Sequence, residues 1–150
     1  MNAREFFVAA RDAVQRIVEF ERRLEAKREL SVMRARSDGP RGKGGVTDPS
    51  RRIDDLMEFE AESERERRQD TRLVLDASSV LNGYAAIDPN GAAVLRMRYL
   101  QLMPWRDISE TTGTEYDAVR SIESVAFDRI DSEGLAAMRD GVLISTGAEQ

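Results

Sequence analysis

The spacing of apolar residues predicts a chain built from helices. Residues 3–36 contain no glycine or proline and are rich in Ala, Arg, Glu and Leu, which favours one long helix. Its apolar residues recur three, four and seven positions apart and form one stripe: Phe7, Ala10, Val14, Ile17 and Leu24. Because a helix of this kind is marginal in water, a partner helix must cover the stripe, from the same chain or from another copy.

A second long helix is predicted after a Gly/Pro-rich basic loop at residues 37–50. Asp48 can cap this helix, and Pro49 suits its first position. The apolar face is interrupted over residues 60–70, where eight of eleven residues are charged, a composition typical of a solvated face. The apolar face then continues up to Tyr84. Residues 1–88 are therefore predicted to form a helical hairpin, packed at its ends with a wet middle, or a projecting stalk that serves oligomerisation.

The C-terminal part predicts three shorter helices. A break at residues 88–91 is followed by a helix over 91–102, a second that starts at Pro104 and ends at Gly113, and a third over 115–130. Glycine accepts the left-handed backbone that a tight turn needs. Thr114 is the predicted cap of the last helix. Residues 132–150 are predicted to make one short amphipathic turn and then a loose tail.

Apolar residues on both sides of Gly113 indicate that the last two helices pack together. Ile108 precedes the glycine by five residues, and Val119 and Ile122 follow it by six and nine. These three side chains would close a small core across the turn, with Ser109 small where the helices approach. This spacing is typical of a helix-turn-helix, which offers its second helix to the major groove of DNA.

This segment resembles region 4 of bacterial sigma factors. The matching positions are Leu95, Arg96, Arg98, Tyr99, Trp105, Asp107, Ile108, Gly113, Val119, Arg120, Ile122, Glu123 and Ala126. The order of the whole chain also resembles small phage and prophage proteins, which include late-transcription activators of the RinA and ArpU type. The resemblance implies an all-α fold with a three-helix unit at 89–131, and a sequence-specific regulator that binds double-stranded DNA near host RNA polymerase as a homo-dimer or higher homo-oligomer.

Helical spacing identifies the side chains that would meet DNA. The outward positions of the last helix are Glu115, Tyr116, Asp117, Arg120, Ser121 and Ser124. Arg120 is the best candidate for a base contact because a guanidinium can bind O6 and N7 of guanine together. Arg98 and Arg106 are candidate phosphate contacts. Arg41 and Lys43 in the basic loop are further ones, although a solvated turn between antiparallel helices is the favoured interpretation of that loop. Trp105, the only tryptophan, is interpreted as a core anchor.

The composition narrows the class of protein. The chain has no cysteine and no histidine, which excludes a Ser-His-Asp triad, a Cys-His pair and a histidine-bearing zinc site. No carboxylate pair stands out, so we expect no enzyme and no cofactor or metal. The sequence shows no signal peptide and no apolar run of membrane-spanning length, so we expect a cytoplasmic protein of a bacterial host cell with no membrane partner.

The charge distribution keeps two other functions open. The net charge is −5; residues 1–50 contribute +3, while residues 51–89 and 90–150 contribute −4 each. An acidic recognition unit suits a protein-docking oligomer in which the helix-turn-helix is vestigial, because DNA phosphates attract basic surfaces. A small DNA-packaging (terminase) subunit is the third interpretation, since it too combines such a unit with an oligomerising helix.

Overall fold

The structure, a computed structural model, describes residues 1–36 and 49–139, and this part of the chain is helical throughout, as the sequence predicts. The helices are α1 (Ala3–Arg36), α2 (Pro49–Ala85), α3 (Pro89–Leu95), the π-helix η1 (Arg96–Leu100), α4 (Trp105–Thr112) and α5 (Tyr116–Glu133). Residues 135–139 add a short helical segment. We call α1 and α2 the stalk and residues 89–139 the head. The predicted basic loop, including Arg41 and Lys43, and residues 140–150 of the predicted tail lie outside the described residues.

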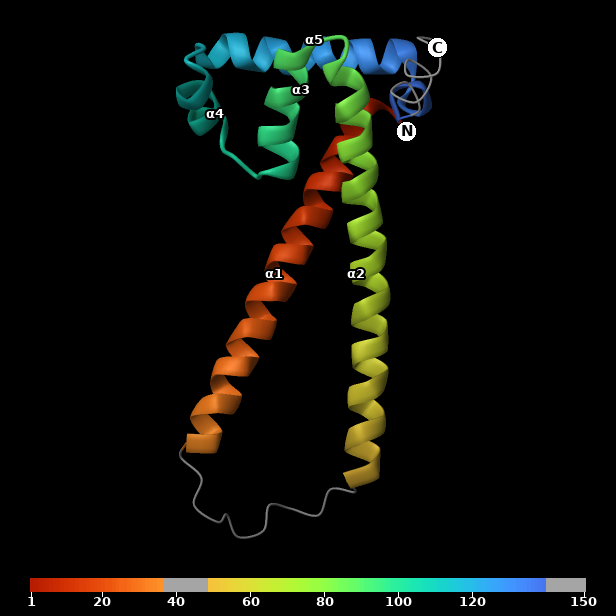
Figure 1. The fold of residues 1–150 in the computed structure, drawn as a ribbon, viewed down its shortest axis with the longest axis vertical. Helices are drawn as coiled ribbons and strands as arrows, with labels where there is room; N and C mark the ends of the chain where they lie inside the picture. The colour runs from red at the N-terminus through yellow and green to blue at the C-terminus, as the bar shows by residue number, and fades with distance from the viewer. Residues whose placement is uncertain (37–48, 140–150) are drawn as a thin grey trace, which may run out of the picture.

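The head sits across one end of the stalk. In Figure 1, α5 lies across the top, while α1 and α2 run down from it and separate toward their far ends. Of the two arrangements predicted for residues 1–88, a hairpin packed at both ends or a projecting stalk, the single chain is nearer to the second: the two helices pack beside the head and diverge away from it. The physical reason is that the aromatic and aliphatic partners of the stalk lie in the head, where the core forms.

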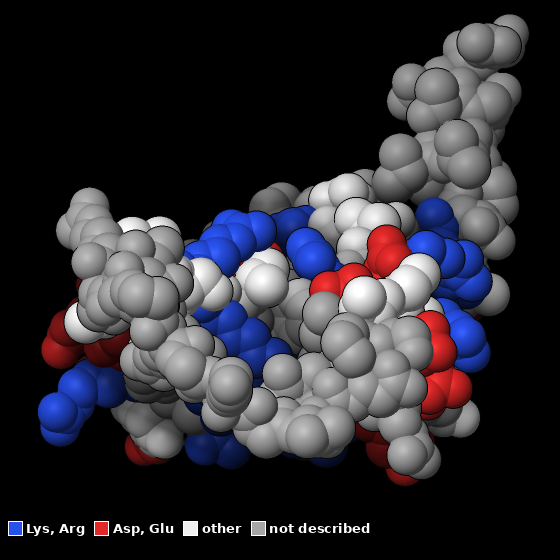
Figure 2. Space-filling model, turned by 90° about the horizontal axis from the view of Figure 1, so that it is seen from below, with Lys and Arg blue, Asp and Glu red and all other residues white. Residues whose placement is uncertain are grey.

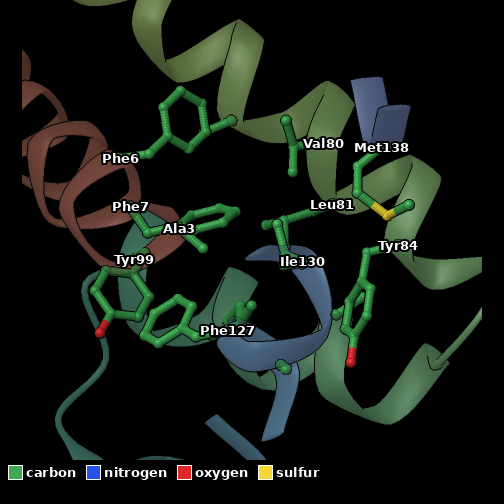
Figure 3. Close-up of a cluster of buried hydrophobic side chains, with 14 of the residues drawn as sticks. Ala3, Phe6, Phe7, Val80, Leu81, Tyr84, Tyr99, Phe127, Ile130 and Met138 are labelled. Carbon is green, nitrogen blue, oxygen red and sulfur yellow. The ribbon is translucent and has the colours of Figure 1, made fainter. Parts of the chain in front are cut away.

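One apolar core joins the stalk to the head across the boundary predicted near residue 88. Its buried members come from α1, α2, α3, η1 and α5 and from the last described segment. They are Ala3, Phe6, Phe7, Ala10, Ala77, Val80, Leu81, Tyr84, Ala92, Leu95, Tyr99, Ala126, Phe127, Ile130 and Met138. Figure 3 shows Phe7, Tyr99 and Phe127 lying together, and their ring centroids are 5.6–5.9 Å apart. These rings from three helices fix α5 to the top of the stalk.

The start of α1 is anchored by its own cap and by α5. The Asn2 side chain accepts from the Glu5 amide at 2.8 Å, and the Glu5 carboxylate accepts from the Asn2 amide at 3.2 Å, which is a reciprocal capping box. The Ala3 amide donates to Asp131 of α5 at 2.6 Å. The first turn of the stalk is thus held by both local and long-range hydrogen bonds.

The predicted helix over 91–102 differs from the structure in start and in shape. It begins at Pro89, because Asp88 caps it by accepting from the Gly91 amide at 3.0 Å. It then widens into a π-helix at residues 96–100, and Leu102, with φ of 57°, turns the chain toward α4. A π-helical turn inserts an extra residue and rotates the downstream residues about the helix axis, which apolar periodicity alone does not reveal.

Candidate nucleic-acid interface

The turn between α4 and α5 has the geometry that the sequence predicts. Gly113 ends α4 in the left-handed region with φ of 65°, and open space surrounds the position of a Cβ there. Ile108 and Val119 are fully buried and pack with Val94 in a second small core, against which Ile122 also lies. The prediction that residues on both sides of Gly113 close a core is confirmed.

The predicted cap of α5 is wrong by one residue. Glu115 occupies the N-cap position without a side-chain hydrogen bond, and the helix begins at Tyr116. The Thr114 hydroxyl is used elsewhere, since it donates back to the Thr112 carbonyl at 3.4 Å. Ser109 donates to the Thr114 carbonyl at 2.5 Å, so this small residue ties the turn to α4.

The outward face of α5 is free of the stalk within the single chain. All six residues predicted to face outward are at least partly exposed, and Tyr116 is 48% exposed: Glu115, Tyr116, Asp117, Arg120, Ser121 and Ser124. Arg106 on α4 is exposed as well, and Arg98 is half-buried. The sequence interpretation missed Val125, which is 60% exposed on the same helix.

A buried carboxylate on the inner face of α5 was not predicted as a structural anchor. Glu123 is 2% exposed, accepts from the Tyr99 hydroxyl at 2.6 Å, and lies 3.7 Å from the Arg4 guanidinium. Burial and this hydrogen bond raise the pKa of Tyr99 well above its ordinary value. Because a buried charge needs partners, these contacts hold α5 in one orientation on η1 and α1.

Trp105 has a second role beyond the predicted core anchor. It packs against the second core, but its indole ring also lies beside two arginines. The guanidinium carbons of Arg98 and Arg120 are 4.9 and 4.8 Å from the ring centroid, which is cation–π distance. The structure therefore brings together two of the predicted DNA-binding residues, which belong to different helices.

Charge on the described surface is mixed. Figure 2 shows Lys and Arg side chains interspersed with Asp and Glu on the face seen from below. On the outer side of α5, Arg120 has acidic neighbours at 115 and 117, which agrees with the acidic balance of this part of the sequence. The outer side of α5 is therefore not a strongly basic surface.

The described residues contain no cluster of acidic side chains arranged as a metal site. None of the helices within 1–36 and 49–139 has a segment of the length and apolarity needed to cross a bilayer. Comparison of the chain with protein families, with curated proteins and with solved structures found no match.

Proposed function

We propose that this protein binds double-stranded DNA through the outward face of α5 and regulates transcription. In this proposal α4, the Gly113 turn and α5 act as a helix-turn-helix of the sigma region 4 type. Its eighteen residues make α5 about 27 Å long, enough to lie along a major groove. The observation that carries the proposal is that a glycine turn and a small core brace a helix whose polar outer face stays exposed.

By its resemblance the protein is a phage or prophage regulator of the late-gene activator type, acting in a bacterial cell. The described residues upstream of the head form a stalk of two helices. We therefore propose an adaptor that binds promoter DNA beside host RNA polymerase rather than a complete sigma factor.

We further propose that the stalk mediates homo-oligomerisation. Its far ends, which we call the arms (residues 19–36 of α1 and 49–70 of α2), expose large apolar side chains. Those described are Leu30, Val32, Met33, Ile53, Met57 and Phe59. The arm of α1 carries more basic than acidic residues, and that of α2 carries more acidic than basic ones. Opposite net charges favour pairing of α1 with α2 of a second copy, which would double a weak DNA contact.

The DNA proposal is tested by fluorescence anisotropy on promoter fragments at several salt concentrations. We expect sequence preference and an affinity that falls as salt rises. Arg120→Ala should cost about 1–3 kcal/mol of binding free energy and relax preference at one base. Arg65→Ala on the stalk, which removes the same charge from an exposed position, is the matched control. Absence of duplex binding at low salt by the folded protein contradicts the proposal.

A protein-docking or DNA-packaging oligomer is the second candidate, favoured by the acidic head and the apolar arms. Light scattering separates the candidates because a dimer suits a regulator, whereas a ring of roughly eight or more copies suits packaging. A ring that binds packaging-site DNA but no promoter would replace the first proposal with this one.

A further inference from the structure

Two arginines from separate helices converge beside Trp105, and a third lies close to one of them. Arg98 belongs to η1 and Arg120 to α5, and their guanidinium carbons lie 4.9 and 4.8 Å from the centroid of the indole ring. Arg11 of α1 is the third: it lies one helical turn after Phe7, whose ring packs against that of Tyr99 next to Arg98, and its charge acts on Arg98. The site therefore combines the stalk with the head.

The Glu123 carboxylate offsets only part of the positive charge of this cluster. Within the ranges that the structure describes, none of the three guanidinium groups forms a salt bridge. The nearby carboxylate of Glu123 is already engaged by Tyr99 and Arg4. Burial, followed by the charges of Arg11 and Arg120, lowers the pKa of Arg98.

Hydrogen-bonding capacity also remains unused. The Nε of Arg11 is buried without a hydrogen-bond partner among the described residues. Arg98 donates to the Met103 carbonyl at 3.3 Å, and Arg120 donates to the Tyr116 hydroxyl at 3.5 Å, which is at the limit of a hydrogen bond. Like charges held together, with donors to spare, are stabilised by an added anion.

We propose that Arg11 and Arg98 form a binding site for a phosphate group, supplied by the DNA backbone next to the groove in which Arg120 contacts a base. This inference rests on the proposed function. Guanidinium groups suit phosphate because their donors match its oxygens in pairs. Stacking on Trp105 holds Arg98 in place, so less side-chain freedom is lost on binding.

Participation of Arg11 makes the stalk part of the DNA interface. A phosphate contact carries no sequence information, but it fixes the orientation and register of a protein on the duplex. A contact from α1 together with one from α5 would set the angle at which the stalk leaves the DNA. Arg11 also adds positive charge to an interface in which the outer face of α5 carries little.

The test uses the single tryptophan as an optical reporter. The full-length protein is titrated with promoter duplex and, separately, with inorganic phosphate, and Trp105 emission is followed. We expect the duplex to change the emission. Arg11→Ala should weaken duplex binding roughly tenfold for all sequences alike and reduce the salt slope by about 1. Arg11→Lys, which keeps the charge, should recover much of the affinity.

Arg16→Ala is the matched control, because Arg16 lies on the same helix but is already paired with Asp70 at 2.8 Å. Alanine is a strong helix former, so neither substitution should unfold α1, which circular dichroism verifies. Equal affinity and salt slope for Arg11→Ala, Arg16→Ala and the unchanged protein overturn the inference while the proposed DNA binding stands. A response to inorganic phosphate that Arg11→Ala abolishes, without any response to duplex, supports the anion site but overturns DNA as its source and the proposed function.

Discussion

Similar apolar side chains are buried at one end of the stalk and exposed at the other. Beside the head, Phe7 of α1 is fully buried among rings from η1 and α5. Near the other end of the same helix, Leu30 and Met33 are 54% and 65% exposed. The difference is the presence of a third element, since α5 and η1 cover the stalk only at its head end (Figure 1).

Between the two ends, long side chains bridge the diverging helices. The Arg67 guanidinium lies over the Phe20 ring at 5.4 Å and the Lys27 ammonium over Phe59 at 5.2 Å. They border a cleft of about 810 Å³ between α1 and α2. Contacts of this kind stabilise weakly, so the single chain concentrates its folding energy at the head, and the exposed arms are where we propose that copies associate.

The largest expected effect tests this contrast directly. Phe7→Ala removes a ring from the main core and should destabilise the protein by about 3–5 kcal/mol. Leu30→Ala on the exposed arm should cost less than about 0.5 kcal/mol when the chain is monomeric. Urea unfolding followed by circular dichroism at low concentration measures both. A cost for Leu30→Ala that grows with protein concentration would locate the proposed association in the arms. Equal losses of stability for the two variants at low concentration would show that the two ends of the stalk do not differ in this way.

Substitution of two glycines provides the next test, and each substitution should destabilise the protein for a different physical reason. A Cβ at Gly83 would clash with the Met138 carbonyl oxygen, 1.8 Å away, so the segment at 135–139 must move. We expect Gly83→Ala to cost about 1–3 kcal/mol. Gly113→Ala meets no neighbour and its cost comes only from the left-handed backbone, about 1 kcal/mol.

Limited proteolysis distinguishes these two glycine variants. Gly83→Ala should release the last described segment and make it a cleavage site, whereas Gly113→Ala should not. Gly113→Asn, which tolerates the left-handed backbone better, should recover part of the loss at the turn. An intact C-terminal segment in Gly83→Ala, with no change in unfolding temperature, would show that the close approach of α2 to Met138 is not required.

Local patterns in the sequence were sufficient to predict the long helices, the Gly113 turn and its small core. Each depends on residue spacing within one or two helices, which periodicity reports directly. The exposed outward face of α5 follows from the same spacing. Whether that face binds DNA remains a prediction.

Features that depend on contacts between distant segments were not predictable in this way. The π-helix at 96–100, the Tyr99–Glu123 hydrogen bond and the stacking of Arg98 and Arg120 on Trp105 all depend on how separate helices pack. The role of Arg11 had a weak signal, because it lies seven residues after Arg4 and so on the same side of α1. Such a spacing alone does not distinguish a binding site from a solvated face.

The smallest expected effect concerns the ion pair where the stalk helices begin to part. Arg16 donates to Asp70 through Nε at 3.1 Å and through a terminal nitrogen at 2.8 Å, and the hydrogen bond raises the pKa of Arg16. Its side chain is 58% exposed, so solvent screens the attraction, and Arg16→Ala should cost at most about 1 kcal/mol. Arg23→Ala, which breaks only an exposed pair with Glu19 inside α1, is the control at about 0.3–0.5 kcal/mol. The difference between the two should disappear at about 1 M salt, where the screening length is roughly 3 Å. A salt-insensitive loss as large as that of Phe7→Ala would instead mean that charge, rather than the aromatic core, holds the two stalk helices together at the head.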